Sequence, residues 1–307
     1  MKKQLLLASI AFITGVCAEA QTLQSDNFDA LTVGNIGATL DASTAGQGGW
    51  YTYAATQGAA SNFQIVTETG RGNVLSVQGV NVASGTTEAT NNTRFIWKGA
   101  VNWASRTTGN NVARLEVDIF TGAATTSKNF HNIMIVNSAG KLVVGFQYAP
   151  QTRGLLGLTT GYVTGSTTDT ETKGIGLATV NNQPAAATLP ANSWVKIICY
   201  VNYTTGVTTY QIPSMTINGS YNNTIYTGAG ASTYAPAEVD FVAGGGAANT
   251  ASSTLKYDNY LLTATNSETA NVDSRLLEEF KIFPNPTTGI INFTKNDNVE
   301  VNSIEFT

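Results

Sequence analysis

The sequence predicts an all-β protein whose main domain is a two-sheet antiparallel jelly-roll sandwich. Short runs of alternating apolar and polar residues recur along the chain, and Gly, Asn, Thr and Pro separate them. No stretch after residue 20 shows an apolar period of 3.6 residues, which a surface helix would need. Many short strands joined by turn signals are typical of sandwiches and barrels.

The strongest strand patterns are rich in β-branched and aromatic residues. They cover residues 74–78, 94–98, 112–120, 131–137, 142–148, 194–203, 207–212, 239–243 and 255–264. In 112–120, Leu115 and Val117 share one face while Glu116 and Asp118 share the other, which predicts a half-buried strand with a polar outer face. Gly206 supplies the positive φ that a tight turn between 194–203 and 207–212 often needs.

The N-terminus reads as an export signal at residues 1–20. Two lysines precede an apolar run at 5–16, which is too short for a permanent membrane anchor. Ala18 and Ala20 are the small residues that signal peptidase prefers, so we expect cleavage before Gln21. Cys17 leaves open a lipoprotein, but the bulkier residue before it favours ordinary cleavage.

Loss of the signal removes Lys2, Lys3 and Glu19 and changes the net charge from −4 to −5. A mildly acidic chain without a basic cluster argues against a nucleic-acid partner. Cys199 is then the only cysteine, so no internal disulfide can form. It alternates with apolar neighbours in 194–203, which predicts a buried apolar role.

The composition divides the chain into a sandwich at 21–266, a polar linker at 267–279 and a C-terminal segment at 280–307. The last segment contains Phe283-Pro284-Asn285-Pro286, then Thr288-Gly289 and a strand at 290–293. The two prolines bracket Asn285 and favour an extended segment followed by a turn, and Gly289 permits the chain to reverse.

This string resembles the C-terminal sorting domain of the type IX (Por) secretion system. The resemblance implies a small β-sandwich that an outer-membrane translocon recognises. It also implies a secreted or cell-surface protein, exported through the periplasm and across the outer membrane. Members of that family continue for several more strands, so we expect residues 280–307 to hold only part of the domain.

The middle domain resembles the concanavalin-like lectin/glucanase jelly rolls, which include laminin-G-like modules. The resemblance rests on short motifs at 26–29, 33–34, 48–50, 193–196, 203–206 and 257–260. It implies that the first and last strands pair and bring Phe28 near Tyr260. Function varies widely on this fold, so the fold alone decides none.

Glu116-Val117-Asp118 resembles the catalytic strand of laminarinase-type glucanases, in which carboxylates alternate on one face. The resemblance implies a nucleophile and a general acid. The third acid is missing, because Phe120 and Thr121 stand at its two candidate positions, and a second near-match at 238–243 also lacks it. We favour an ion-paired sheet face over a catalytic pair.

Glycan binding needs flat aromatic faces, for which Trp50, Tyr51, Tyr53 and Trp103 are the leading candidates because they lie next to turn-like residues. Further candidates are Tyr148, Tyr162 and Tyr234, whereas Trp97 and Trp194 lie within strands and are assigned to the core.

A structural calcium ion is a second candidate ligand, with Asp26, Asp29 and Asp258 as its ligands if the end strands pair. His131 is the only histidine, so a zinc site is not expected, and we predict an ordinary strand residue there.

Three functions stay open. The leading hypothesis is a non-catalytic surface protein that binds an extracellular glycan or contributes to adhesion. The second is a secreted polysaccharide-cleaving enzyme, and the third is a structural surface module without a small ligand. Aromatic side chains exposed in a groove favour the first, a carboxylate pair facing that groove favours the second, and neither feature favours the third.

Overall fold

The computed structural model describes residues 20–54, 58–83, 93–168, 170–268, 281–283 and 292–294. The chain divides into two units, Met1–Asn266 and Ser267–Thr307. Nearly all of the predicted signal peptide and most of the linker lie outside the described residues. No helix among the described residues is long and apolar enough to cross a membrane.

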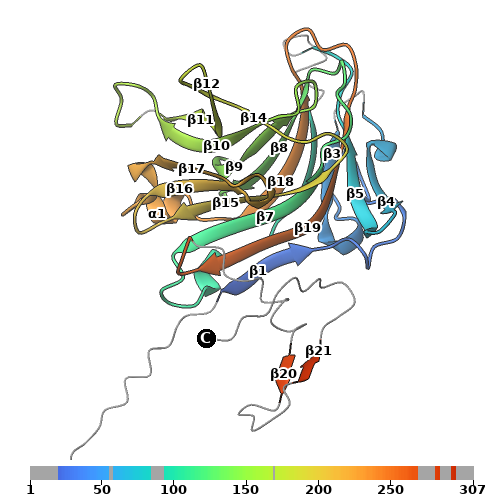
Figure 1. Ribbon diagram of the computed structural model, residues 1–307. Helices are drawn as coiled ribbons and strands as arrows, with labels where there is room; N and C mark the ends of the chain where they lie inside the picture. The colour runs from blue at the N-terminus through green and yellow to red at the C-terminus, as the bar shows by residue number, and fades with distance from the viewer. Residues whose placement is uncertain are drawn as a thin grey trace, which may run out of the picture. The chain divides into compact units, whose positions relative to one another are not determined.

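Sheet A of the first unit is antiparallel throughout, and Figure 1 shows its central strands side by side. Its order is β17 (Ile217–Asn222), β16 (Val207–Ile212), β15 (Trp194–Asn202), β7 (Val112–Phe120), β19 (Thr254–Thr265), β5 (Gly72–Gln78), β4 (Phe63–Glu68) and β2 (Gly34–Asn35). The long β19 also pairs with β1 (Gln21–Asp26), with Asp26 opposite Tyr260. This pairing confirms the prediction that the first and last strands of the domain are neighbours.

Sheet B is antiparallel as well. Its order is β11 (Thr170–Gly176), β10 (Gly154–Tyr162), β9 (Leu142–Ala149), β8 (Asn129–Val136), β18 (Glu238–Gly245), β6 (Arg94–Lys98) and β3 (Tyr51–Ala54), and β14 (Ala187–Thr188) pairs with β10. Outside the two sheets, β12 (Ala178–Val180) pairs with β13 (Gln183–Ala185), and α1 (Gly230–Thr233) is a single turn.

The chain crosses from one sheet to the other after β2, β3, β5, β6, β7, β14, β17 and β18. Repeated crossing between two antiparallel sheets is how a jelly roll covers its core. The predicted fold class is therefore confirmed.

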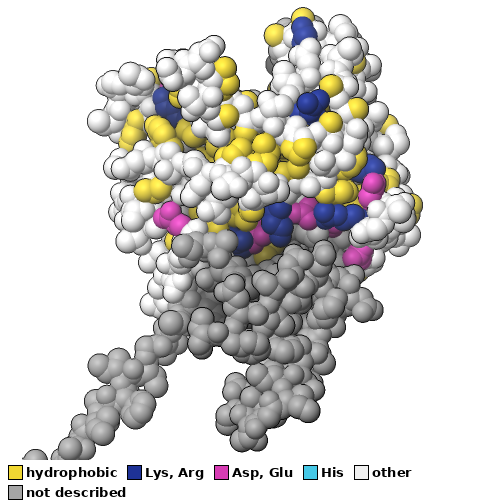
Figure 2. Space-filling model, viewed as in Figure 1, with side chains coloured by type: hydrophobic (Ala, Val, Ile, Leu, Met, Phe, Trp, Pro, Cys, Tyr) yellow, Lys and Arg dark blue, Asp and Glu magenta, His cyan; other side chains and the backbone are white. Residues whose placement is uncertain are grey.

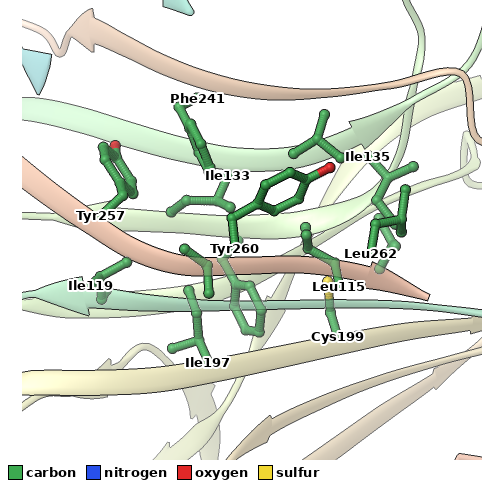
Figure 3. Close-up of a cluster of buried hydrophobic side chains, with 14 of the residues drawn as sticks. Leu115, Ile119, Ile133, Ile135, Ile197, Cys199, Phe241, Tyr257, Tyr260 and Leu262 are labelled. Carbon is green, nitrogen blue, oxygen red and sulfur yellow. The ribbon is translucent and has the colours of Figure 1, made fainter. Parts of the chain in front are cut away.

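The space between the sheets is filled by one large hydrophobic cluster. Figure 3 shows Ile133 and Phe241 from sheet B meeting Leu115 and Ile197 from sheet A, with Tyr260 between the layers. Phe241 stacks on Tyr257 with ring centroids 4.5 Å apart. Because apolar burial stabilises a fold by about 25 cal/mol per Å², this layer of large buried side chains supplies most of the stability.

Cys199 was predicted to be buried and His131 to be an ordinary strand residue, and both lie inside the sandwich. Cys199 is buried on the inner face of β15, and desolvation raises the pKa of its thiol. His131 is buried on the inner face of β8, 3.1 Å from the hydroxyl of Ser253, and desolvation lowers its pKa to about 3. The single histidine is thus an uncharged core residue.

The sequence pattern did not predict several strands, because their residues are typical of turns. Strand β10 reads GLLGLTTGY, β11 reads TETKGIG and β17 reads INGSYN. Their pairing in the sheet overrides these weak propensities. In the second unit, β20 (Lys281–Phe283) pairs with β21 (Asn292–Thr294), while Pro284, Asn285, Pro286 and Gly289 lie outside the described residues.

We expect Phe241→Ala to lower the free energy of unfolding by about 3–5 kcal/mol, because it leaves a cavity between the sheets. Val180→Ala is the control, since Val180 is 55% exposed on β12, and it should change stability by no more than about 0.5 kcal/mol. Urea denaturation measures both. Equal effects of the two substitutions would contradict the placement of the core.

Candidate functional site

Strands β3 and β6 place four aromatic rings on the outer face of sheet B. Alternation sends Thr52 and Ile96 inward, where both are fully buried, and turns their neighbours outward. The register sets Tyr51 opposite Trp97 and Tyr53 opposite Phe95. We call these four outward rings, Tyr51, Tyr53, Phe95 and Trp97, the aromatic platform.

The platform is stacked and partly exposed to solvent. The rings of Tyr51 and Trp97 are stacked, with centroids 5.6 Å apart and planes 17° apart, and Tyr53 meets Phe95 edge-on at 6.0 Å. Tyr53 is 39% exposed, and the other three rings are half-buried. Flat rings with an exposed surface suit the apolar faces of sugars.

Strand β18 sets polar groups beside the platform. Its Asp240 is opposite Trp97 of β6 on one side and Met134 of β8 on the other. Glu238 precedes it on the same face of the strand. One step further across the sheet, Gln147 donates a hydrogen bond of 3.1 Å to Asn132. Carboxyl groups therefore lie next to the rings, and amide groups lie on the two strands beyond them.

Asp240 is an acid in an environment that disfavours its charge. Its Oδ1 is inaccessible and has no hydrogen-bond partner among the described residues. Burial, and then the negative charge of Glu238, raise the pKa of Asp240 to about 8. Burial also raises the pKa of Glu238. At neutral pH, Asp240 is thus mostly an uncharged carboxylic acid.

Glu116 and Asp118 lie instead on the outer face of sheet A, where both are ion-paired. Glu116 pairs with Arg114, and its other oxygen is 3.3 Å from Lys196 Nζ. Asp118 pairs with Arg71 at 2.6 Å and accepts a hydrogen bond of 3.0 Å from Asn259. The geometry is that of the ion-paired sheet face rather than a carboxylate pair open to a substrate.

Arg71 connects this face to the turn between β4 and β5. It also pairs with Asp258 at 3.1 Å, and its guanidinium lies 4.5 Å from the ring centroid of Trp194. Lys256 pairs with Glu68 at the end of the same row. Figure 2 shows the resulting band, in which basic and acidic side chains alternate across the strands. Charges of opposite sign compensate one another along it.

The structure corrects the expected exposure of two tryptophans. Trp50 is fully buried and donates its Nε1–H to Asp26 Oδ2 at 2.9 Å. Trp103 is 6% exposed and packs on Tyr203 with centroids 5.2 Å apart. A neighbouring turn marks where a strand ends and does not tell which face the ring takes. Neither ring can stack on a ligand in this conformation.

Trp97 and Trp194 show the opposite error. Both were assigned to the core, and both are half-buried on outer faces, Trp97 on sheet B and Trp194 on sheet A. Among the further candidates, Tyr148 and Tyr234 are buried, and Tyr162 is half-buried. Phe95 was missed, although its alternation with Ile96 in 94–98 was the signal that could have found it.

The three aspartates expected to bind calcium have separate partners. Asp26 pairs with Lys98 at 3.3 Å, and Asp258 is held by Arg71. Asp29 accepts the backbone N–H of Asn73 at 2.9 Å. Because cations of the protein occupy two of the carboxylates, these residues do not fit a calcium site. The described part of the chain contains no group of three His, Cys, Asp or Glu residues that could hold a metal.

The sequence matches no protein-family model and no curated protein. Among solved structures, the CBM2 module of Lactobacillus casei BL23 phage J-1 evolved Dit has a TM-score of 0.49 and 8% identity, over 83% of this chain and all of the other. Cellulose induced protein, Cip1, has a TM-score of 0.45 and 18% sequence identity, and the match covers 79% of this chain and 97% of Cip1. A sialidase has a TM-score of 0.45 and 9% sequence identity, and the match covers 80% of this chain but only 19% of the sialidase chain. At TM-scores below 0.5 these similarities assign no function.

Asp240 should make stability depend on pH. The unfolded chain loses this proton near pH 4, whereas the folded protein keeps it to about pH 8. The unfolded state therefore binds fewer protons in this window, and the free energy of unfolding falls as pH rises through it. We expect the melting temperature of Asp240→Asn to match the parent near pH 4 and to exceed it by about 10 °C at pH 8.

Thermal unfolding across this pH range provides the test. Glu171→Gln is the matched control, because Glu171 is exposed and pairs with Lys173 elsewhere on sheet B. The difference in melting temperature between Glu171→Gln and the parent should be the same at every pH in this range. A constant difference for Asp240→Asn as well would show that Asp240 ionises normally.

Proposed function

We propose that the aromatic platform binds an extracellular glycan and that the protein is a non-catalytic, exported glycan-binding or adhesion protein. One observation carries the proposal: four partly exposed rings lie side by side on one sheet face, next to carboxyl groups and with amide groups further across the same sheet. Contiguous aromatic surface that solvent reaches is a common feature of binding sites. Rings for the apolar faces of a sugar and polar groups for its hydroxyls are what a glycan site requires.

A second candidate function, polysaccharide cleavage, has one specific observation in its favour. Glu238 and Asp240 are two residues apart on one strand face, which spaces them by about 6.6 Å along the backbone. A carboxyl group with a raised pKa beside a second carboxyl group is the arrangement that glycosidases use. Release of reducing ends from a bound polysaccharide, lost in Asp240→Asn and in Glu238→Gln, would establish this function instead.

Export is a separate part of the proposal and rests on the two ends of the sequence. We propose that residues 1–20 direct the chain to the periplasm. Residues 280–307 then present a type IX sorting motif to the outer-membrane translocon, which would be a partner of this protein. The predicted destination is the cell surface or the medium.

We expect Tyr53→Ala and Trp97→Ala each to weaken glycan binding roughly tenfold or more, as the loss of an aromatic anchor does. Tyr221→Ala removes a half-buried ring from β17 of the other sheet and should leave binding unchanged. A glycan array finds the ligand, and calorimetry on the best sugar gives the affinities. Binding that survives both platform substitutions would place the site elsewhere, and no binding to any sugar would favour a structural surface module.

Export is tested in a bacterium that carries a type IX system. The exported protein should begin at Gln21, and the double substitution Asn285→Ala with Gly289→Ala should retain it in the periplasm. Val180→Ala is the control for the export assay. N-terminal sequencing and fractionation measure both results, and unchanged release of the double variant would refute the sorting motif.

A further inference from the structure

We propose that the ligand is an uncharged glycan and that it binds only to the form of the protein in which Asp240 carries a proton. This inference rests on the proposed glycan-binding function and identifies the ligand class and the active form of the site. Asp240 lies beside the platform, opposite Trp97 in the register of β18 and β6. In this proposal, a sugar bound at Trp97 also lies against the neighbouring Asp240.

The geometry explains why the protonated form is needed. One oxygen of Asp240 is already inaccessible and has no hydrogen-bond partner in the described part of the chain, so a negative charge there is poorly solvated. A ligand that covers the remaining surface of the group removes still more water. The protonated acid avoids this cost and can donate a hydrogen bond to a hydroxyl or ring oxygen of the sugar.

The described residues that flank Asp240 do not supply a compensating charge. Its cross-strand neighbours, Trp97 on β6 and Met134 on β8, do not ionise in this pH range. Glu238 on its own strand is another acid. His131, which is the titratable residue of β8, is buried on the inner face and uncharged at neutral pH.

The two cations of β6 have other partners. Lys98 pairs with Asp26 at 3.3 Å. Arg94 donates to the backbone oxygens of Gln78, at 2.8 Å, and Gly79, at 2.5 Å. An acidic sugar on the platform would thus lie close to the negative charge of Glu238, and neither cation of β6 would be free to pair with the sugar. Uncharged sugars avoid this repulsion.

Proton linkage gives a quantitative expectation. If the ligand binds only the protonated form, affinity falls as Asp240 ionises, by about tenfold between pH 7 and pH 9. Asp240→Asn is uncharged at every pH, so its affinity should vary less than about twofold over this range. In Glu238→Gln the loss should begin at lower pH, because a negative neighbour no longer helps to hold the proton.

Calorimetry on the purified protein provides the test, with cellohexaose, laminarihexaose, xylohexaose and hexagalacturonate as probes. Glu171→Gln is the control and should follow the parent, and circular dichroism at each pH verifies the fold. We expect at least one uncharged probe to bind about tenfold or more tightly than hexagalacturonate.

The outcomes separate this inference from the function on which it rests. An uncharged probe that binds equally well at pH 7 and pH 9 would overturn the role of Asp240 and leave the glycan-binding function intact. Tighter binding of hexagalacturonate would overturn the ligand class. Failure of all four probes would overturn the proposed function and this inference with it.

Discussion

Strand β18 has to bury Val239 and Phe241 between the two sheets, and this requirement determines what sheet B can show to solvent. Side chains alternate along a strand, so burial of these two residues turns Glu238 and Asp240 outward. The same rule acts on β6 next to it. A one-residue slip of β18 would turn Val239 and Phe241 outward and bury the acids, and a slip of β6 would bury Phe95 and Trp97. The outer face is therefore fixed by the packing inside.

The two outer faces use their acids differently because their neighbouring strands differ. On sheet A, β15 and the turn after β4 bring Lys196 and Arg71 to Glu116 and Asp118, and the charges compensate. On sheet B, the strands on either side of Asp240 bring Trp97 and Met134, which carry no charge. One face is consequently a network of ion pairs that ties a turn to the sheet. The other combines an acid with aromatic rings, and this is the face to which we assign function.

The sequence predicted the elements whose alternation is strong and failed where the face of a residue depends on its partners. Strand 112–120, with its inward Leu115 and Val117, was predicted with the boundaries that the structure has. The sequence predicted an ion-paired face around Glu116 and Asp118. It did not reveal that Arg71, the partner of Asp118, comes from a distant turn, because no local pattern shows such a contact. Trp50 was expected to be exposed and is buried, whereas Trp97 was expected in the core and lies on an outer face. Turn-like neighbours in the sequence do not determine which face of a sheet a side chain takes. The pairing with neighbouring strands determines that face, and the register of this pairing depends on residues far apart in the sequence.

The measurement that tests the central claim most directly is the indole N–H spectrum of the protein, titrated with the uncharged glycan that binds best. The chain has four tryptophans, so the spectrum contains four side-chain signals. Trp97 lies on the platform, Trp194 lies on sheet A, and Trp50 and Trp103 are buried. The account predicts that the signal of Trp97 moves with ligand while that of Trp194 stays in place. Movement of Trp194 with a stationary Trp97 would contradict it.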